Sequence, residues 1–133
     1  MTNRLSHALV FCIAASALLA HHSTALYDVS KPVTVRGTVK IFQWSNPHVL
    51  AFVVSEPGNS QPQQTWRLEF TSPGNLTRMG HSKRSLNPGD VISATCYQFR
   101  DGSLGGLVDK VTLENGRVLD FQRAADLEKP GLR

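Results

Sequence analysis

The order of the predicted elements is the feature that most limits what this chain can fold into. Segments in which apolar and polar residues alternate are typical of half-buried β-strands. Three such segments come first, one short helix pattern follows, and further strand patterns complete the chain. The predicted strands cover residues 33–44, 48–54, 66–70, 91–99, 107–113 and, as a short last strand, 117–121.

Local signals within this order mark a bend and the one helix. Gly37 interrupts the first strand, and the apolar residues change from odd to even positions before Phe42. We therefore expect a bulge or a sharp bend in this strand. The helix is expected over 71–80, because Ser72 suits its N-cap, Pro73 its first position and Gly80 its end.

These elements predict an all-β fold with one short helix. A single helix between the third and fourth strands is the arrangement of the OB-fold, a small Greek-key barrel. We predict an OB-like barrel of five to six strands over residues 33–121. A β-sandwich is the competing architecture, and the position of the helix argues against it. The 133 residues have room for one domain, and a hydrophobic content of 41% excludes a wholly disordered chain.

The N-terminal segment predicts export. Arg4 precedes an apolar run of 13 residues, Ala8 to Ala20, which fits a secretory signal. The run is shorter than the ~20 residues that a membrane-spanning helix needs, and a buried core helix is the alternative interpretation. We expect a signal peptide over 1–20 and cleavage after Ala20. Ala17 and Ala25 also meet the preference for a small residue at the cleavage site.

Export has consequences for the rest of the chain. The mature protein is expected to be periplasmic or secreted, with no stable membrane insertion after cleavage. Its barrel would lie between an irregular N-terminal arm, 21–32, and a flexible C-terminal tail, 122–133. Cys12 falls within the signal peptide, so Cys96 has no cysteine partner in the mature chain. Cys96 alternates with Ile92 and Ala94 on one strand face, so we expect it to be buried and unreactive.

Three histidines form the strongest candidate site for chemistry. His21 would become the N-terminal residue after cleavage at Ala20, and its α-amine and ring nitrogen could both bind one metal ion. His22 follows directly, and His48 opens the second predicted strand near the expected mouth of the barrel. Such a set of nitrogen ligands suits Cu(II), with Zn(II) as the other candidate. Solvated histidines without a metal are the alternative. Binding through both the α-amine and the ring of His21, an arrangement called a histidine brace, requires cleavage after Ala20.

Other residue groups have weaker claims to function. The aromatic residues Trp44, Trp66 and Phe52 could form a stacking platform, but their spacing favours the barrel core. Arg78, Lys83 and Arg84 could bind an anion, and a solvated positive face is the simpler interpretation. The net charge of +4 is modest, and an exported protein rarely meets nucleic acid, so we expect no nucleic-acid partner. The carboxylates are scattered over turns and strand edges without an acid–base pair, so we expect no enzyme.

A set of ordered motifs resembles the bacterial exported proteins of the domain of unknown function 6152 family. The resemblance covers residues 20–119. It implies that the His-His-Ser start and the Asn-Pro-His turn belong to one pattern, but it implies no activity, substrate or cofactor. Family members tend to have a tryptophan at the position of His81, which could otherwise supply a further metal ligand. The motifs are His21-His22-Ser23, Lys31-Pro32-Val33-Thr34, Gly37-Thr38-Val39, Trp44-Ser45-Asn46-Pro47-His48, Ser72-Pro73-Gly74-Asn75-Leu76, Leu86-Asn87-Pro88-Gly89-Asp90 and Asp101-Gly102-Ser103.

The sequence thus predicts a small exported binding domain. The most specific form of this prediction is that His21, His22 and His48 bind Cu(II) or Zn(II). The alternative is a non-enzymatic accessory module that binds a periplasmic protein or a small ligand through its barrel face. A copper enzyme with redox activity is a third hypothesis, with the least support.

Overall fold

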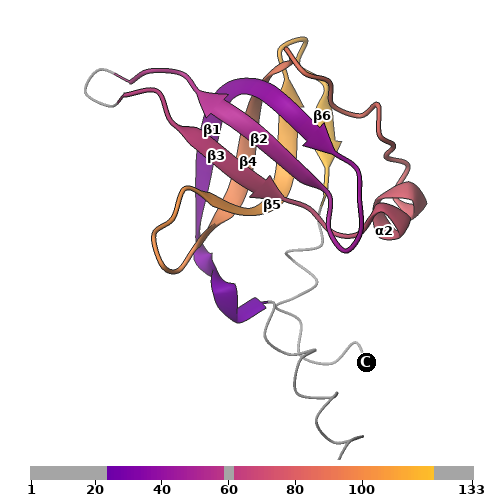
Figure 1. Cartoon of the computed structure of the whole chain (residues 1–133), viewed down its shortest axis with the longest axis horizontal. Helices are drawn as coiled ribbons and strands as arrows, with labels where there is room; N and C mark the ends of the chain where they lie inside the picture. The colour runs from indigo at the N-terminus through magenta and orange to yellow at the C-terminus, as the bar shows by residue number, and fades with distance from the viewer. Residues whose placement is uncertain (1–23, 59–61, 122–133) are drawn as a thin grey trace, which may run out of the picture.

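The computed structural model describes residues 24–58 and 62–121, and in them the chain forms a small closed β-barrel (Figure 1). Six strands and one short α-helix follow a single turn of 3-10 helix. The elements are η1 (Thr24–Leu26), β1 (Tyr27–Gln43), β2 (Leu50–Ser55), β3 (Thr65–Glu69), α2 (Pro73–Arg78), β4 (Val91–Phe99), β5 (Gly105–Leu113) and β6 (Val118–Asp120).

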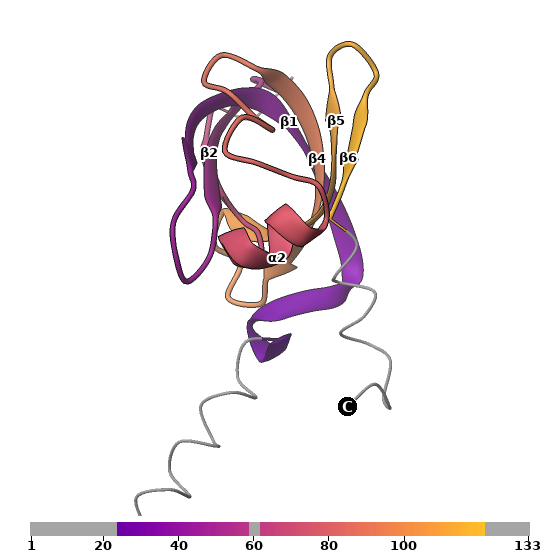
Figure 2. The same cartoon turned by 90° about the vertical axis from the view of Figure 1, so that its right-hand side faces the viewer.

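The strand order confirms the predicted OB-like Greek-key barrel. The sheet runs β3-β2-β1-β4-β5-β6, and a further pairing of β3 with β5 closes it. That closing pair is parallel, whereas the others are antiparallel. Figure 2 shows α2 lying across the opening of the curled sheet, while the β5–β6 hairpin extends beyond it. No helix in 24–58 or 62–121 is long and apolar enough to cross a membrane.

β1 is long enough to belong to both halves of the barrel. Its first part pairs with β4, from Tyr27 opposite Phe99 onward, and its second part pairs with β2. Gly37 lies in both ladders, and a Cβ atom there would come within 2.3 Å of the carbonyl oxygen of Val54. The expected change of phase is present as a register shift between Val39 and Ile41. Gly37 therefore lies where β1 belongs to both ladders, and the bulge follows it.

The prediction of an irregular arm up to residue 32 is wrong for its last six residues. β1 begins at Tyr27, not at Val33. Most side chains between Tyr27 and Val35 are exposed or half-buried, and the register with β4 shifts between Tyr27 and Pro32. Because of that shift this stretch shows no alternation of apolar and polar residues. The predicted segments 1–20 and 122–133 lie outside the described residues.

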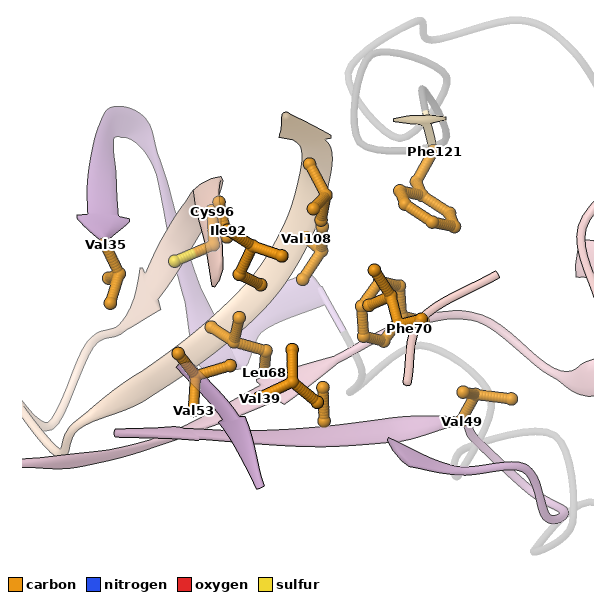
Figure 3. Packing of buried hydrophobic residues seen from close by; sticks show 14 of the residues in the cluster. Val35, Val39, Val49, Val53, Leu68, Phe70, Ile92, Cys96, Val108 and Phe121 are labelled. Atoms are coloured by element: carbon orange, nitrogen blue, oxygen red, sulfur yellow. The ribbon is translucent and has the colours of Figure 1, made fainter. Parts of the chain in front are cut away.

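The core is a set of buried aliphatic and aromatic side chains inside the barrel (Figure 3). Val39, Leu68 and Ile92 come from β1, β3 and β4, and each is at most 1% exposed. At one end Phe70 packs edge-to-face on Phe121, with ring centroids 4.8 Å apart.

The helix α2 starts where the sequence predicted. Ser72 is its N-cap, its hydroxyl accepts a hydrogen bond from the Asn75 amide, and Pro73 occupies the first turn. Leu76 is the helix residue that is fully buried, so it anchors α2 to the barrel.

Candidate functional site

His48 lies in the connection between β1 and β2, two residues before β2 starts at Leu50. The expectation that it opens the second strand is therefore wrong by a short distance. Its neighbour Val49 is fully buried, accepts a hydrogen bond from the amide of Phe70 (2.9 Å) and donates one to the carbonyl of Thr71 (3.2 Å). The backbone beside His48 is thus tied to the segment that follows β3, while the His48 side chain is 45% exposed.

The partner of His48 is Glu69, the last residue of β3. Nδ1 of His48 and Oε1 of Glu69 are in hydrogen-bond contact. The Glu69 side chain is only 15% exposed, and Nη2 of Arg67 lies 4.0 Å from its second oxygen, Oε2. A carboxylate that orients an imidazole in this way is common beside metal-bound histidines and beside histidines that act as general bases.

Tyr27 joins the same carboxylate from the start of β1. The pKa of its phenol is raised well above the ordinary value, first by burial, then by the negative charge of Glu69 and by a hydrogen bond to Glu69. The Tyr27 ring is stacked on Phe99, with centroids 5.2 Å apart. The guanidinium of Arg67 lies over the Phe99 ring, 4.9 Å from its centre. Glu69 therefore has a tyrosine, a histidine and an arginine as neighbours.

Sequence reasoning did not find this group. It treated Glu69 as one of several scattered carboxylates, and Glu69 is 21 residues away from His48 along the chain. The only signal that could have found the contact is strand register. Leu50 pairs with Glu69 in the β2–β3 ladder, which brings the residues just before β2 to the end of β3.

The family of this chain follows from its sequence. The model of a family of unknown function, DUF6152, matches residues 8–110, more than half of the chain. The chain belongs to DUF6152. No curated protein matches this DUF6152 chain.

Solved structures with a similar fold include two crystal forms of Rim1, a mitochondrial single-stranded DNA binding protein from S. cerevisiae. Their TM-scores are 0.48 and 0.47 at 8% and 7% identity, and the matches cover 63% of this chain and 93% and 92% of theirs. At these values the likeness carries no conclusion about what this DUF6152 protein binds. The absence of a nucleic-acid partner stays a prediction.

The other two predicted metal ligands, His21 and His22, lie outside the described residues. Within 24–58 and 62–121 no three histidine, cysteine or acidic side chains come together as a metal site. His48 and Glu69 are the part of the candidate site that the structure describes.

His81 has a packing role in this DUF6152 protein. Its ring stacks on Phe121 with centroids 4.2 Å apart, and its Nε2 is 2.8 Å from the carbonyl oxygen of Asp120. A carbonyl only accepts, so Nε2 donates and has no lone pair for a metal. The flat imidazole thus packs at the position where the family resemblance implied a tryptophan.

The aromatic residues are divided between the two faces of the sheet. Trp44 and Trp66 are partly buried and pack against the core, as predicted. Phe52 is half-buried on the outer face, where it pairs with Ile41 of β1 and Arg67 of β3.

The predicted basic cluster lies at the surface. Arg78, Lys83 and Arg84 are exposed, and Arg78 donates a hydrogen bond to Asn75 in its own helix. A cleft of about 430 Å³ lies elsewhere, between the turn before β4 and the β5–β6 turn. It contains none of the predicted site residues, and its charged lining residues are Asp90 and Glu114.

Proposed function

We propose that this DUF6152 protein is a small exported binding domain that captures a transition metal ion, Cu(II) or Zn(II), through His21, His22 and His48. Its role is to hold or hand over the metal ion, without catalytic turnover. The compartment is the periplasm or the extracellular space. The proposal combines the predicted export signal, the histidines that follow it, and the surroundings of His48.

One observation carries the proposal: Glu69 contacts both His48 and Tyr27. Tyr27 is five residues after His22, and five residues of extended chain span at most about 18 Å. Tyr27 lies near His48 through Glu69, and we propose that the arm histidines, five and six residues before Tyr27, reach His48. No other histidine in the described part of the chain has this relation to the N-terminal segment.

The ligand chemistry favours copper over zinc when cleavage occurs after Ala20. The α-amine and imidazole of His21 would then supply two nitrogen ligands, and His48 would supply a third. Nitrogen ligands bind Cu(II) more tightly than other divalent ions of the first transition row, and Cu(II) accepts a planar arrangement. Cleavage after Ala17 would leave imidazole ligands only, and cleavage after Ala25 would remove both arm histidines.

Native mass spectrometry of protein exported through its own signal peptide tests this function. The protein is offered substoichiometric Cu(II), and one spectrum gives both the N-terminal residue and the bound metal. We expect a chain that begins at His21 and retains one copper ion. The His48→Ala variant should lose the copper ion, and His81→Ala, which removes a packing histidine, should retain it. A chain that begins at Leu26, or a chain from His21 without copper, would contradict the proposal.

The outer face of the sheet supports a second candidate, the accessory module. Ile41 is 53% exposed, although it is a large aliphatic residue, and it pairs with Phe52, which pairs with Arg67. A periplasmic protein or small ligand could bind to this apolar and cationic strip. A photo-crosslinking residue at position 52 should then capture a partner that the same residue at the exposed position 118 does not capture. His48→Ala would leave that complex intact.

A further inference from the structure

We infer that Glu69 is the positioning residue of the candidate site: it holds His48 with its proton on Nδ1 and so leaves Nε2 as the lone pair that can bind a metal ion. The metal part of this inference rests on the proposed function. The positioning part stands on the geometry alone and can be tested without metal.

The hydrogen-bond chemistry of the pair determines the tautomer. An ionised carboxylate has no proton to donate, so the ring nitrogen that contacts it must be the donor. Nδ1 of His48 is that nitrogen. A neutral imidazole has one N–H, so Nε2 then carries the lone pair. The His48 side chain as a whole is 45% exposed, so the ring borders the solvent from which an ion would come.

Glu69 is itself held in place by groups other than His48. Its backbone belongs to the β3 ladder, opposite Leu50. The phenol of Tyr27 binds the carboxylate, and Arg67 lies 4.0 Å from Oε2. Tyr27 is 4% exposed and its ring is stacked on Phe99, so the phenol has little freedom to turn away. The carboxylate is therefore in position before any metal arrives.

A carboxylate behind a metal-binding histidine usually matters almost as much as the ligand itself. Loss of such a partner typically lowers metal affinity 10–100-fold. We expect the same range for Glu69→Gln. Tyr27→Phe removes the phenol oxygen but keeps the stacked ring, so it should give a smaller loss in the same direction.

The experiment compares the wild type with Glu69→Gln, Tyr27→Phe and a matched control, Glu56→Gln. Glu56 is a carboxylate that also has an ion pair, with Arg36 at 3.0 Å, but it is far more exposed. Ring ¹⁵N chemical shifts of the metal-free proteins, recorded where the shifts show a neutral imidazole, report which nitrogen of His48 carries the proton. Zn(II) and Cu(II) dissociation constants are then measured by chelator competition.

We expect the Nδ1–H tautomer of His48 in the wild type and in Glu56→Gln. Glu69→Gln should give a 10–100-fold higher Kd, because a neutral amide oxygen accepts more weakly from Nδ1–H than a carboxylate and the amide NH2 group can bind the ring instead. An Nε2–H tautomer in the wild type, or a Kd in Glu69→Gln equal to that of Glu56→Gln, would overturn the inference. If the wild type shows the Nδ1–H tautomer but binds neither metal ion, the positioning holds and the proposed function fails. If Glu69→Gln does not fold, the tautomer of His48 in the wild type decides.

Discussion

Cys96 shows at the scale of one residue how burial removes reactivity. The side chain is fully buried in the barrel, and burial raises the pKa of its thiol to about 11. The nucleophilic form of cysteine is the thiolate, so the folded protein offers almost none of it at neutral pH. We expect iodoacetamide to modify Cys96 only as fast as the barrel opens. The same reagent should react promptly in urea, and rapid modification of the folded protein would show that the strand is accessible.

The same burial makes the stability of the fold sensitive to alkali. In the unfolded chain the Cys96 thiol has its ordinary pKa of 9.0, whereas in the folded protein the pKa is about 11. Between these values the unfolded chain releases the proton first, so the free energy of unfolding falls as the pH rises. One such group changes stability by up to about 1.4 kcal/mol per pH unit.

Tyr27 acts in the same direction above its ordinary pKa of 10.0, because burial and Glu69 raise the pKa of its phenol. Urea unfolding at a series of pH values between neutrality and about 10.5 measures the combined effect. Cys96→Ala should flatten the first part of the decline, above pH 9. A stability that does not change over this range would contradict the assigned burial of both groups.

At the scale of an element, Gly37 shows that β1, which pairs with both β2 and β4, needs a residue without a side chain at this position. A methyl group there would meet the backbone of Val54 at 2.3 Å, and this backbone belongs to the neighbouring strand. We expect Gly37→Ala to destabilise the protein by about 1–3 kcal/mol, the usual cost of forcing extra atoms into a packed site. Chemical denaturation measures this cost.

Gly74→Ala is the matched control for the same chemical change. A Cβ atom at Gly74 would have only the end of the Arg78 side chain near it, at 4.0 Å. Gly74 lies in α2, and alanine is a better helix former than glycine, so we expect a gain of up to about 1 kcal/mol. Equal effects at positions 37 and 74 would show that the bend in β1 tolerates a side chain.

The elements differ in how well they could be predicted from the local sequence. β4 was predicted with its observed limits, and the cap and first residue of α2 were predicted correctly, because local alternation and capping chemistry determine them. The start of β1 was missed because its ladder is interrupted between Tyr27 and Pro32. The contact of His48 with Glu69 was also missed, since it depends on the register of two strands and leaves no local pattern.

The packing of Phe121 at one end of the barrel allows a test at the scale of the whole molecule. Phe121 is 4% exposed and packs on both Phe70 and His81. We expect Phe121→Ala to cost about 3–5 kcal/mol, as for other buried aromatic residues. Val118→Ala in the same hairpin should cost less than about 0.5 kcal/mol, because Val118 is 55% exposed. A small effect at Phe121 would mean that the barrel core does not depend on this end of the chain.

The proposed metal binding must also stabilise the whole fold. An ion that binds only the folded state adds about 2.7 kcal/mol when its free concentration is 100 times its Kd. Thermal unfolding with and without Cu(II) should therefore show a rise in Tm that depends on the metal concentration. His48→Ala should abolish the rise and His81→Ala should keep it. A rise that survives in His48→Ala would place the metal elsewhere.

The parallel pairing of β3 with β5 determines how this chain can reach its folded state. Arg67 and Gly105 are neighbours across that pair although 38 residues separate them, whereas β1 and β2, or β4 and β5, are joined by short connections. Contacts between distant residues carry a large entropic cost and usually form late. Two meanders, β1–β3 and β4–β6, can therefore form early. They join through β1 with β4 and through β3 with β5, and we expect the parallel pair to form last, after the rate-limiting step. Substitutions along β3 that weaken this pair should then mainly speed unfolding and leave the folding rate almost unchanged.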